Sequence, residues 1–256
     1  MTVLVCLAAL ENYKELLVEC DDGYLKYGLI SYYYLKNQET LDLILKKVNF
    51  LLIDSGAHSF QHGKKVNFDK YTQEYADFIR ENTHNEQILG FFEMDVDNVI
   101  GYEKVLELRR ILEQVSDKII PVWHNNRGID DFVEMCKKYS RKRIAITGFV
   151  NNDIRDGQYN LFINTAHKYG CKIHILGLTR YELLKTLNLG KEDSVDSSTW
   201  KQAGIYGTVQ LPRKDLTRTL LYSLQGLKAA KEVDFINFNT AREIQERYDE
   251  IDNSVY

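Results

Sequence analysis

Three aspartates stand at positions where they could take part in covalent chemistry. Asp54, Asp95 and Asp196 each stand where a run of apolar, β-favouring residues stops. In a chain of repeating β-strand and α-helix units, the carboxyl ends of the parallel strands meet at one end of the sheet, where catalytic groups gather. We therefore expect these three carboxylates to converge at one end of a sheet.

Such a set of carboxylates fits a two-step displacement. One ionised aspartate can attack an electrophilic carbon, while a second carboxylic acid protonates the leaving group and later takes the proton back. Retaining glycosidases use this pair, and the same logic suits an N-glycosidic bond whose leaving group is a purine. A third carboxylate could accept hydrogen bonds from N1–H and the exocyclic amine of a guanine-like base. A single aspartate at a strand end can instead cap the next helix, but three in similar contexts favour the chemical interpretation.

The elements around these aspartates predict an α/β fold, a single-domain (β/α)8 TIM barrel over residues 1–256. Short apolar runs alternate with amphipathic stretches, and the runs recur at the spacing of βα units. No Gly-rich phosphate loop follows the first run, which disfavours an open doubly wound sheet. An eighth strand is expected after Ala203, within residues 204–215 or at Phe235–Phe238, and the leucines at positions 216–227 predict a helix. The seven strands expected before Ala203 are residues 2–8, 50–54, 88–95, 119–124, 143–149, 172–178 and 193–197.

Composition and charge describe an ordinary globular chain, with 44% hydrophobic and 27% charged residues. The net charge of −4 excludes an overall basic nucleic-acid binder but allows a local basic surface. The four cysteines lack the close spacing of a zinc site, so we expect neither a metal nor another cofactor. The apolar start has no basic flank, and no run is long enough to span a membrane, so a cytoplasmic protein is expected.

Five short motifs between about residue 50 and residue 200 resemble, in the same order, the motifs of the tRNA-guanine transglycosylases. They are Asp54-Ser55-Gly56-Ala57-His58-Ser59-Phe60, Met94-Asp95, Ile146-Thr147-Gly148-Phe149, Ile175-Leu176-Gly177-Leu178 and Val195-Asp196-Ser197-Ser198.

The resemblance implies a role for each aspartate. Asp196 matches the nucleophile that attacks C1′ of the nucleotide and displaces guanine. Asp54 matches the general acid and base, and Asp95 matches the carboxylate that recognises guanine or a 7-deazaguanine.

Other residues are implied to bind the base. His58 takes the place of an aromatic residue that stacks on the heterocycle, with Leu176 on its other side. Gly148 offers backbone hydrogen bonds, and His124 stands where the family has a glutamine. The motifs also include Ser55, Phe149 and Gly177 among the implied substrate-binding residues.

The chain departs from the tRNA enzymes because it is shorter and lacks their zinc subdomain. It is most similar to the short, zinc-less relatives of phages and genomic islands, which insert 7-deazaguanine derivatives into DNA. The implied partners are DNA, favoured over tRNA, and a free 7-deazaguanine base, in the cytoplasm of the host. The identity of that base and the choice between monomer and homodimer stay open. Four basic residues that follow predicted strands are expected to contact phosphates at the barrel mouth: Arg127, Arg155, Arg180 and Lys201.

Three alternative functions stay open at this point. A tRNA-guanine transglycosylase would use the same chemistry on RNA. Asp95-Val96-Asp97 with His58, His62 and His124 could instead form the metal site of a barrel hydrolase, although no H-x-H pattern follows the first strand. A non-catalytic partner subunit would keep the barrel and bind nucleic acid without exchanging bases. His174, within a predicted strand, is expected to be structural.

Overall fold

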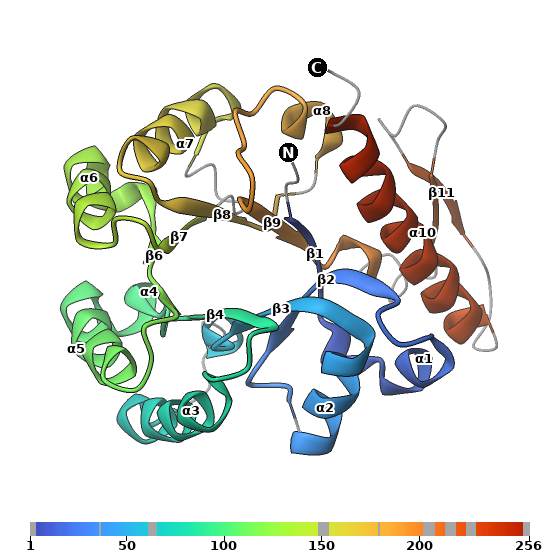
Figure 1. Ribbon diagram of the computed structural model, residues 1–256, viewed down its shortest axis with the longest axis horizontal. Helices are drawn as coiled ribbons and strands as arrows, with labels where there is room; N and C mark the ends of the chain where they lie inside the picture. Colours follow the sequence, from blue (N-terminus) through green and yellow to red (C-terminus); the bar gives the residue numbers. More distant parts are fainter. Residues whose placement is uncertain are drawn as a thin grey trace.

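The computed structural model describes residues 4–35, 37–60, 66–147, 154–178, 180–201, 208–212, 219–223 and 229–252 of the chain. In these residues one parallel sheet curls into a nearly closed barrel, and helices surround it (Figure 1). The predicted (β/α)8-type fold is therefore confirmed. None of the helices described in these residues is long and apolar enough to cross a membrane.

The barrel strands follow one another around the ring in sequence order, and each described pairing between them is parallel. Pro121 separates β5 from β6, because proline has no N–H to donate to the ladder. β5 pairs with β4 and β6 pairs with β7, so together they act as one interrupted strand that joins the two ends of the sheet. The strands are β1 (Leu4–Ala8), β2 (Leu25–Ser31), β3 (Val48–Asp54), β4 (Ile88–Phe92), β5 (Ile119–Ile120), β6 (Val122–Trp123), β7 (Arg143–Thr147), β8 (Lys172–Leu176) and β9 (Ser194–Ser197).

The strand missing from the sequence prediction lies early in the chain, not after Ala203. It is β2, which completes the barrel between β1 and β3. Lys26 and Gly28 interrupt its apolar pattern, which hid it. Gly28 is needed there because a Cβ would lie 2.7 Å from the Leu10 side chain.

The predictions for the C-terminal region were wrong where the structure describes it. Thr208–Pro212 (β10) and Thr219–Ser223 (β11) form a separate antiparallel hairpin, so the helix predicted from the leucines is a strand at residues 219–223. The rest of the predicted stretch lies outside the described residues. Phe235–Phe238 belongs to the long helix α10 (Ala229–Asp252) and not to a strand.

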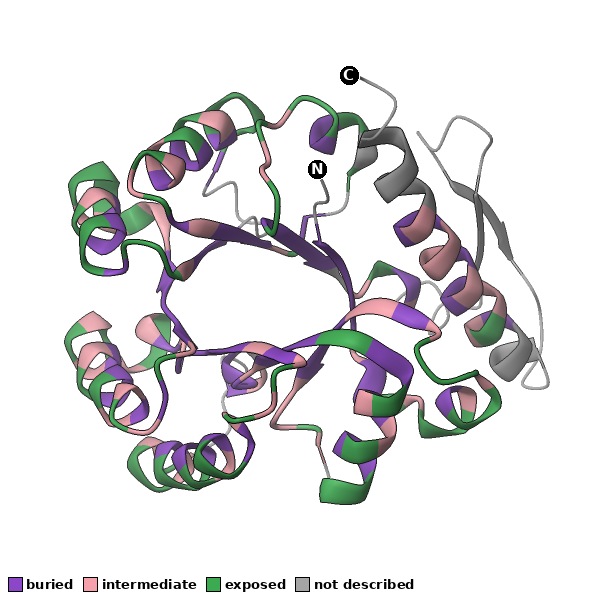
Figure 2. Cartoon of the chain, viewed as in Figure 1, coloured by how far each residue is buried: buried purple, intermediate pink, exposed green. Residues whose placement is uncertain are grey.

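The helices form an outer layer whose buried faces turn toward the sheet and whose exposed faces turn outward (Figure 2). Asn37 caps α2 by accepting a hydrogen bond from the Thr40 amide at 2.9 Å, and Asn67 caps α3 in the same way. The helices before α10 are α1 (Lys14–Glu19), α2 (Gln38–Lys47), α3 (Phe68–Asn82), α4 (Asp97–Ile100), α5 (Tyr102–Glu113), α6 (Gly128–Lys138), α7 (Tyr159–Lys168) and α8 (Tyr181–Leu184).

Strand alternation decides which side chains enter the barrel. In β3, Leu51 and Ile53 pack in the outer core while Leu52 packs in the interior cluster with Cys6 and Phe92. Because side chains alternate along a strand, the residue two positions after Leu52, Asp54, also faces the interior. The apolar interior cluster thus lies beneath the strand ends that carry the polar groups.

Candidate active site

The structure brings the three predicted aspartates to the same end of the barrel. Asp54 ends β3, Asp95 follows β4, and Asp196 lies in β9, all on the carboxyl-terminal side of the parallel sheet. Their charges interact, because both Asp95 and Asp196 raise the pKa of Asp54. The expected convergence of carboxylates is therefore present in the fold.

Asp54 has the properties of a group that exchanges a proton near neutral pH. Burial is the main cause that raises its pKa from 3.8 to about 7, and the charges of Asp95, Asp196 and Glu11 add to it. The Gly56 amide opposes this rise by donating a hydrogen bond to Oδ2 at 3.0 Å. At pH 7 the Asp54 carboxyl group is therefore available both as an acid and as a base.

The turn after Asp54 explains the glycine of its motif. Gly56 has a φ of 85°, which side-chain-bearing residues rarely adopt. A Cβ at this position would also lie 2.2 Å from Cβ of Tyr33. Only glycine therefore allows the tight turn that aims the Gly56 amide at Asp54.

Asp196 presents one held oxygen and one free oxygen. Its Oδ1 accepts hydrogen bonds from the Gly177 amide at 3.0 Å and from Nε2 of His174 at 3.1 Å. No hydrogen bond from the described residues reaches Oδ2, and the side chain keeps 12% of its surface exposed. The carboxylate is thus fixed in orientation while one oxygen can approach a ligand.

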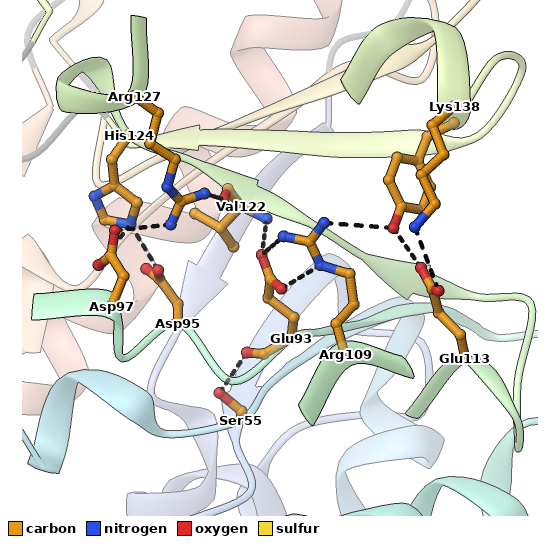
Figure 3. Close-up of polar contacts among 11 residues, drawn as sticks. Ser55, Glu93, Asp95, Asp97, Arg109, Glu113, Val122, His124, Arg127 and Lys138 are labelled. Carbon is orange, nitrogen blue, oxygen red and sulfur yellow. Dashed lines mark hydrogen bonds and ion pairs between the residues drawn. The ribbon is translucent and has the colours of Figure 1, made fainter. Parts of the chain in front are cut away.

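Asp95 forms a polar cluster with the residues after β6 (Figure 3). Its Oδ1 lies 2.6 Å from Nε2 of His124. Burial lowers the pKa of His124, but the hydrogen bond and charge of Asp95, with the charge of Asp97, outweigh it and raise that pKa above 6.5. The contact with Asp95 therefore favours the imidazolium form of His124.

Arg127, which the sequence predicted to contact phosphate, is instead paired within the protein. Its side chain is 5% exposed and donates to Asp97 Oδ2 at 2.8 Å (Figure 3). The guanidinium also stacks 3.9 Å from the ring centroid of Tyr102. It also donates to the Val122 carbonyl at 2.5 Å. These contacts neutralise the charge of the Arg127 guanidinium inside the protein.

The other three predicted basic residues lie nearer the surface. Arg180 pairs with Asp156 at 2.5 Å, with both side chains more than half exposed. Arg155 is exposed directly before the 3-10 helix Asp156–Gln158. Lys201 lies 5.8 Å from the ring centroid of Tyr34 and acts electrostatically on Glu11. These three cations remain candidates for contact with a polyanion.

Ser55 supports the site from below and does not line it with its side chain, which corrects the prediction. It is fully buried, and its Oγ donates to the Glu93 carbonyl at 2.8 Å. The Glu93 carboxylate accepts from Arg109 at 2.5 and 2.9 Å and from the Val122 amide at 2.6 Å (Figure 3). Sequence reasoning missed Glu93 and Arg109, although a glutamate inside an apolar run is a visible signal.

Glu11 is a further carboxyl group at this end of the barrel and was also missed. It follows β1, is 8% exposed, and its Oε2 has no hydrogen-bond partner in the described part of the chain. Burial is the main cause that raises its pKa to about 7. The signal in the sequence was a glutamate that interrupts the first apolar run.

Of the remaining predicted residues, Leu176 and Gly177 lie at the end of β8, beside Asp196. Gly148 and Phe149 lie outside the described residues, as does His62. The backbone of His58 belongs to the 3-10 helix Ala57–Phe60, but its side chain is outside the described part.

One group of ligand atoms could hold a divalent cation. Single atoms of Asp95, Asp97 and His124 lie within 4.8 Å of one another. Oδ1 of Asp97 is buried without a hydrogen-bond partner among the described residues. Two carboxylates and an imidazole suit a transition metal, but the guanidinium of Arg127 already neutralises Asp97 and would repel a cation. The arrangement therefore fits a metal incompletely.

Comparisons with known proteins support the fold and leave the function open. No family model matches the sequence, and no curated protein matches it significantly. A solved structure from Aquifex aeolicus VF5, described as "Structural study of Project ID", is 11% identical. It covers 96% of this chain, this chain covers 93% of it, and the TM-score is 0.50. A likeness at this identity shows a shared fold alone.

Proposed function

We propose that this protein is a base-exchange transglycosylase, which replaces guanine in a polynucleotide with a 7-deazaguanine derivative. The observation that carries the proposal is the pair Asp54 and Asp196. Asp54 has a pKa of about 7, and Asp196 is held by two donors on one oxygen while no hydrogen bond from the described residues reaches its second oxygen. An acid and a nucleophile are the two groups that such a displacement requires.

The first half of the reaction breaks the glycosidic bond. Oδ2 of Asp196 attacks C1′ of the target nucleotide while the bond from C1′ to N9 of guanine breaks. Asp54 in its protonated form donates its proton to the departing base. The result is an ester between Asp196 and the sugar, an ionised Asp54 and free guanine.

The second half reverses these steps with another base. Asp54, now a carboxylate, takes the N9 proton of the incoming 7-deazaguanine, whose N9 attacks C1′ and releases Asp196. Asp54 ends protonated as it began, so no external proton donor is needed. A pKa near the working pH favours both directions of this transfer.

Recognition of the base is assigned to Asp95. An ionised carboxylate accepts from two donors side by side, as N1–H and the exocyclic amine of guanine present them. The contact with His124 at 2.6 Å holds Asp95 in one orientation. An adenine lacks the N1–H donor, so the Asp95 oxygen that would accept from it would gain no hydrogen bond there.

DNA is the proposed polynucleotide. A base within a duplex is out of reach of a barrel-mouth pocket, so it must be flipped out at a cost of a few kcal/mol. Contacts of Arg155, Arg180 and Lys201 with the phosphate backbone of DNA would offset that cost. The 256 residues contain no closely spaced cysteines like those of the zinc subdomain with which the tRNA enzymes are built, which favours DNA over a folded RNA.

The test is the exchange of labelled guanine into matched DNA and tRNA substrates at one salt concentration. The wild-type chain should label DNA, and Asp196→Asn should abolish labelling while the circular dichroism spectrum stays unchanged. Asp117→Asn, an exposed aspartate ahead of β5 at the opposite end of the barrel, is the matched control and should exchange normally. Labelling of tRNA alone would refute the choice of DNA, and full activity in Asp196→Asn would refute the mechanism.

A metal-dependent hydrolase is the second candidate, because the buried Oδ1 of Asp97 has no hydrogen-bond partner among the described residues. Equilibrium dialysis against Zn²⁺ and Mn²⁺ separates the two functions. The transglycosylase proposal predicts no stoichiometric binding and activity that survives EDTA. One tightly bound ion per chain, lost in His124→Ala together with activity, would favour the hydrolase.

A further inference from the structure

A chain of hydrogen bonds runs through the barrel interior and ends on Asp196. The guanidinium of Arg143, at the start of β7, lies 2.8 Å from Oγ of Ser194 at the start of β9. That oxygen lies 2.7 Å from Nδ1 of His174 in β8, and Nε2 of His174 lies 3.1 Å from Oδ1 of Asp196. Ser194 and His174 are both fully buried.

The chemistry of the groups fixes the direction of this chain. Arginine can only donate, so Oγ of Ser194 accepts from Arg143 and keeps its own O–H to donate. The nearest acceptor for that proton is Nδ1 of His174. A neutral imidazole that accepts at Nδ1 carries its proton on Nε2, which then donates to Asp196.

The surroundings favour this neutral form of His174. Burial lowers the pKa of the imidazole and the charge of Arg143 adds to that effect, while the hydrogen bond and charge of Asp196 oppose both. Cys6 pairs with Asp196 in the sheet, and burial raises the pKa of its thiol, so it stays neutral. The ring of Phe92 packs on His174 at a centroid distance of 4.9 Å. The neutral side chains of Ser194 and His174 thus link the Arg143 cation to the Asp196 carboxylate.

We infer that His174 is a positioning residue for Asp196, and that Arg143 and Ser194 set its tautomer. With His174 Nε2–H and the Gly177 amide both on Oδ1, the carboxylate is turned so that Oδ2 forms the bond to the sugar. The inference rests on the proposed function, since it assigns Asp196 as the nucleophile. It also changes the interpretation of His174, which the sequence suggested to be structural only.

Ser194 offers a way to disturb Asp196 without touching any group near the substrate. In Ser194→Ala, Nδ1 of His174 loses the donor that excludes a proton there, so the tautomer with its proton on Nδ1 becomes accessible. The lone pair of Nε2 would then face the Asp196 carboxylate and repel it. The nucleophile would lose one of the two donors that orient it.

The first experiment reads the tautomer directly, without any enzymatic assay. Nitrogen-15 NMR of histidine-labelled protein should place the His174 proton on Nε2 in the wild type between pH 6 and pH 8. Ser194→Ala should shift the population toward Nδ1–H. Cys6→Ala, a buried neighbour of Asp196 outside the chain of hydrogen bonds, is the matched control and should keep the wild-type tautomer.

The second experiment measures base exchange in the same variants. Ser194→Ala and His174→Ala should lower kcat by about 10- to 100-fold, the loss expected when a reacting group is misplaced, with KM for the polynucleotide little changed. His174→Gln, which can donate from its amide to Asp196, should recover part of kcat. Cys6→Ala should keep the wild-type kcat.

The outcomes distinguish the positioning role of His174 from the proposed transglycosylase function. An Nδ1–H tautomer in the wild type, or an unchanged tautomer and kcat in a folded Ser194→Ala, would overturn the inference while the transglycosylase stands. A wild type that exchanges no base, with the Nε2–H tautomer in place and lost in Ser194→Ala, would overturn the proposed function and with it the role of His174 in positioning a nucleophile.

Discussion

Two carboxyl groups near the same end of the barrel, the buried Glu93 and the half-buried Asp54, are held in opposite ways. Glu93 accepts two hydrogen bonds from one edge of the Arg109 guanidinium and a third from the Val122 amide, so its charge is paired. Asp54 accepts one hydrogen bond, from Gly56, and faces other carboxylates. The difference separates a carboxylate that holds the fold together from one that is kept ready to exchange a proton.

The largest effect should come from removing the ion-pair partner of Glu93. Arg109→Met would leave the charge of Glu93 buried and uncompensated, which typically costs about 3–5 kcal/mol. Urea denaturation should report this loss in the free energy of unfolding. Arg110→Met, at the exposed neighbouring position, should change that free energy by less than about 0.5 kcal/mol. Equal small losses in both variants would show that Glu93 is not held by Arg109.

The carboxyl group of Asp54 should matter for catalysis and not for folding. Asp54→Asn removes the acid and base, so exchange should fall by about 10²- to 10⁴-fold while the fold is kept. Steady-state exchange of labelled guanine measures the loss. A variant that is inactive because it is unfolded, or one that keeps the wild-type rate, would contradict the assigned role.

The pH dependence of stability sharpens the same contrast. The pKa of Asp54 is raised to about 7 in the folded protein. The contribution of its protonated form to the free energy of unfolding is therefore fully present below pH 4 and is lost as pH rises through 7. Asp54→Asn removes this dependence, so from pH 5 to pH 8 the variant should lose less stability than the wild type, by roughly 1–3 kcal/mol. Glu11→Gln should act in the same direction, since the pKa of Glu11 is also raised to about 7. Parallel stability curves for wild type and variants would contradict the raised values.

The smallest effect is expected at the surface. The pair of Arg180 and Asp156 is more than half exposed on both sides, and such pairs contribute about 0–1 kcal/mol. Arg180→Ala should therefore leave thermal stability nearly unchanged. If the residue contacts phosphate, the slope of log affinity for DNA against log salt should decrease by about one. An unchanged slope would show that Arg180 does not contact the polynucleotide.

The sequence predicted which aspartates stand at strand ends better than it predicted the elements and contacts around them. Asp54, Asp95 and Asp196 were visible because each stops an apolar run. β2 was not, because Lys26 and Gly28 break its pattern and its neighbours supply the pairing.

The supporting contacts escaped sequence reasoning for a different reason. Arg127 was expected to meet phosphate, but Asp97, far away in the sequence, pairs with it inside the fold. His174 and Ser194 likewise meet only because β8 and β9 are adjacent strands. Ion pairs and tautomers of this kind depend on tertiary structure, which spacing along the chain does not encode.

The central claim, that Asp196 forms a covalent bond with the sugar of the target nucleotide, can be tested by mass spectrometry. Wild-type protein incubated with a guanine-containing oligonucleotide, without an incoming base, is denatured, digested and mapped. The account predicts one peptide that carries the nucleotide on Asp196 and no adduct in Asp196→Asn. An adduct on Asp54, or exchange that proceeds with no adduct in any variant, would contradict it.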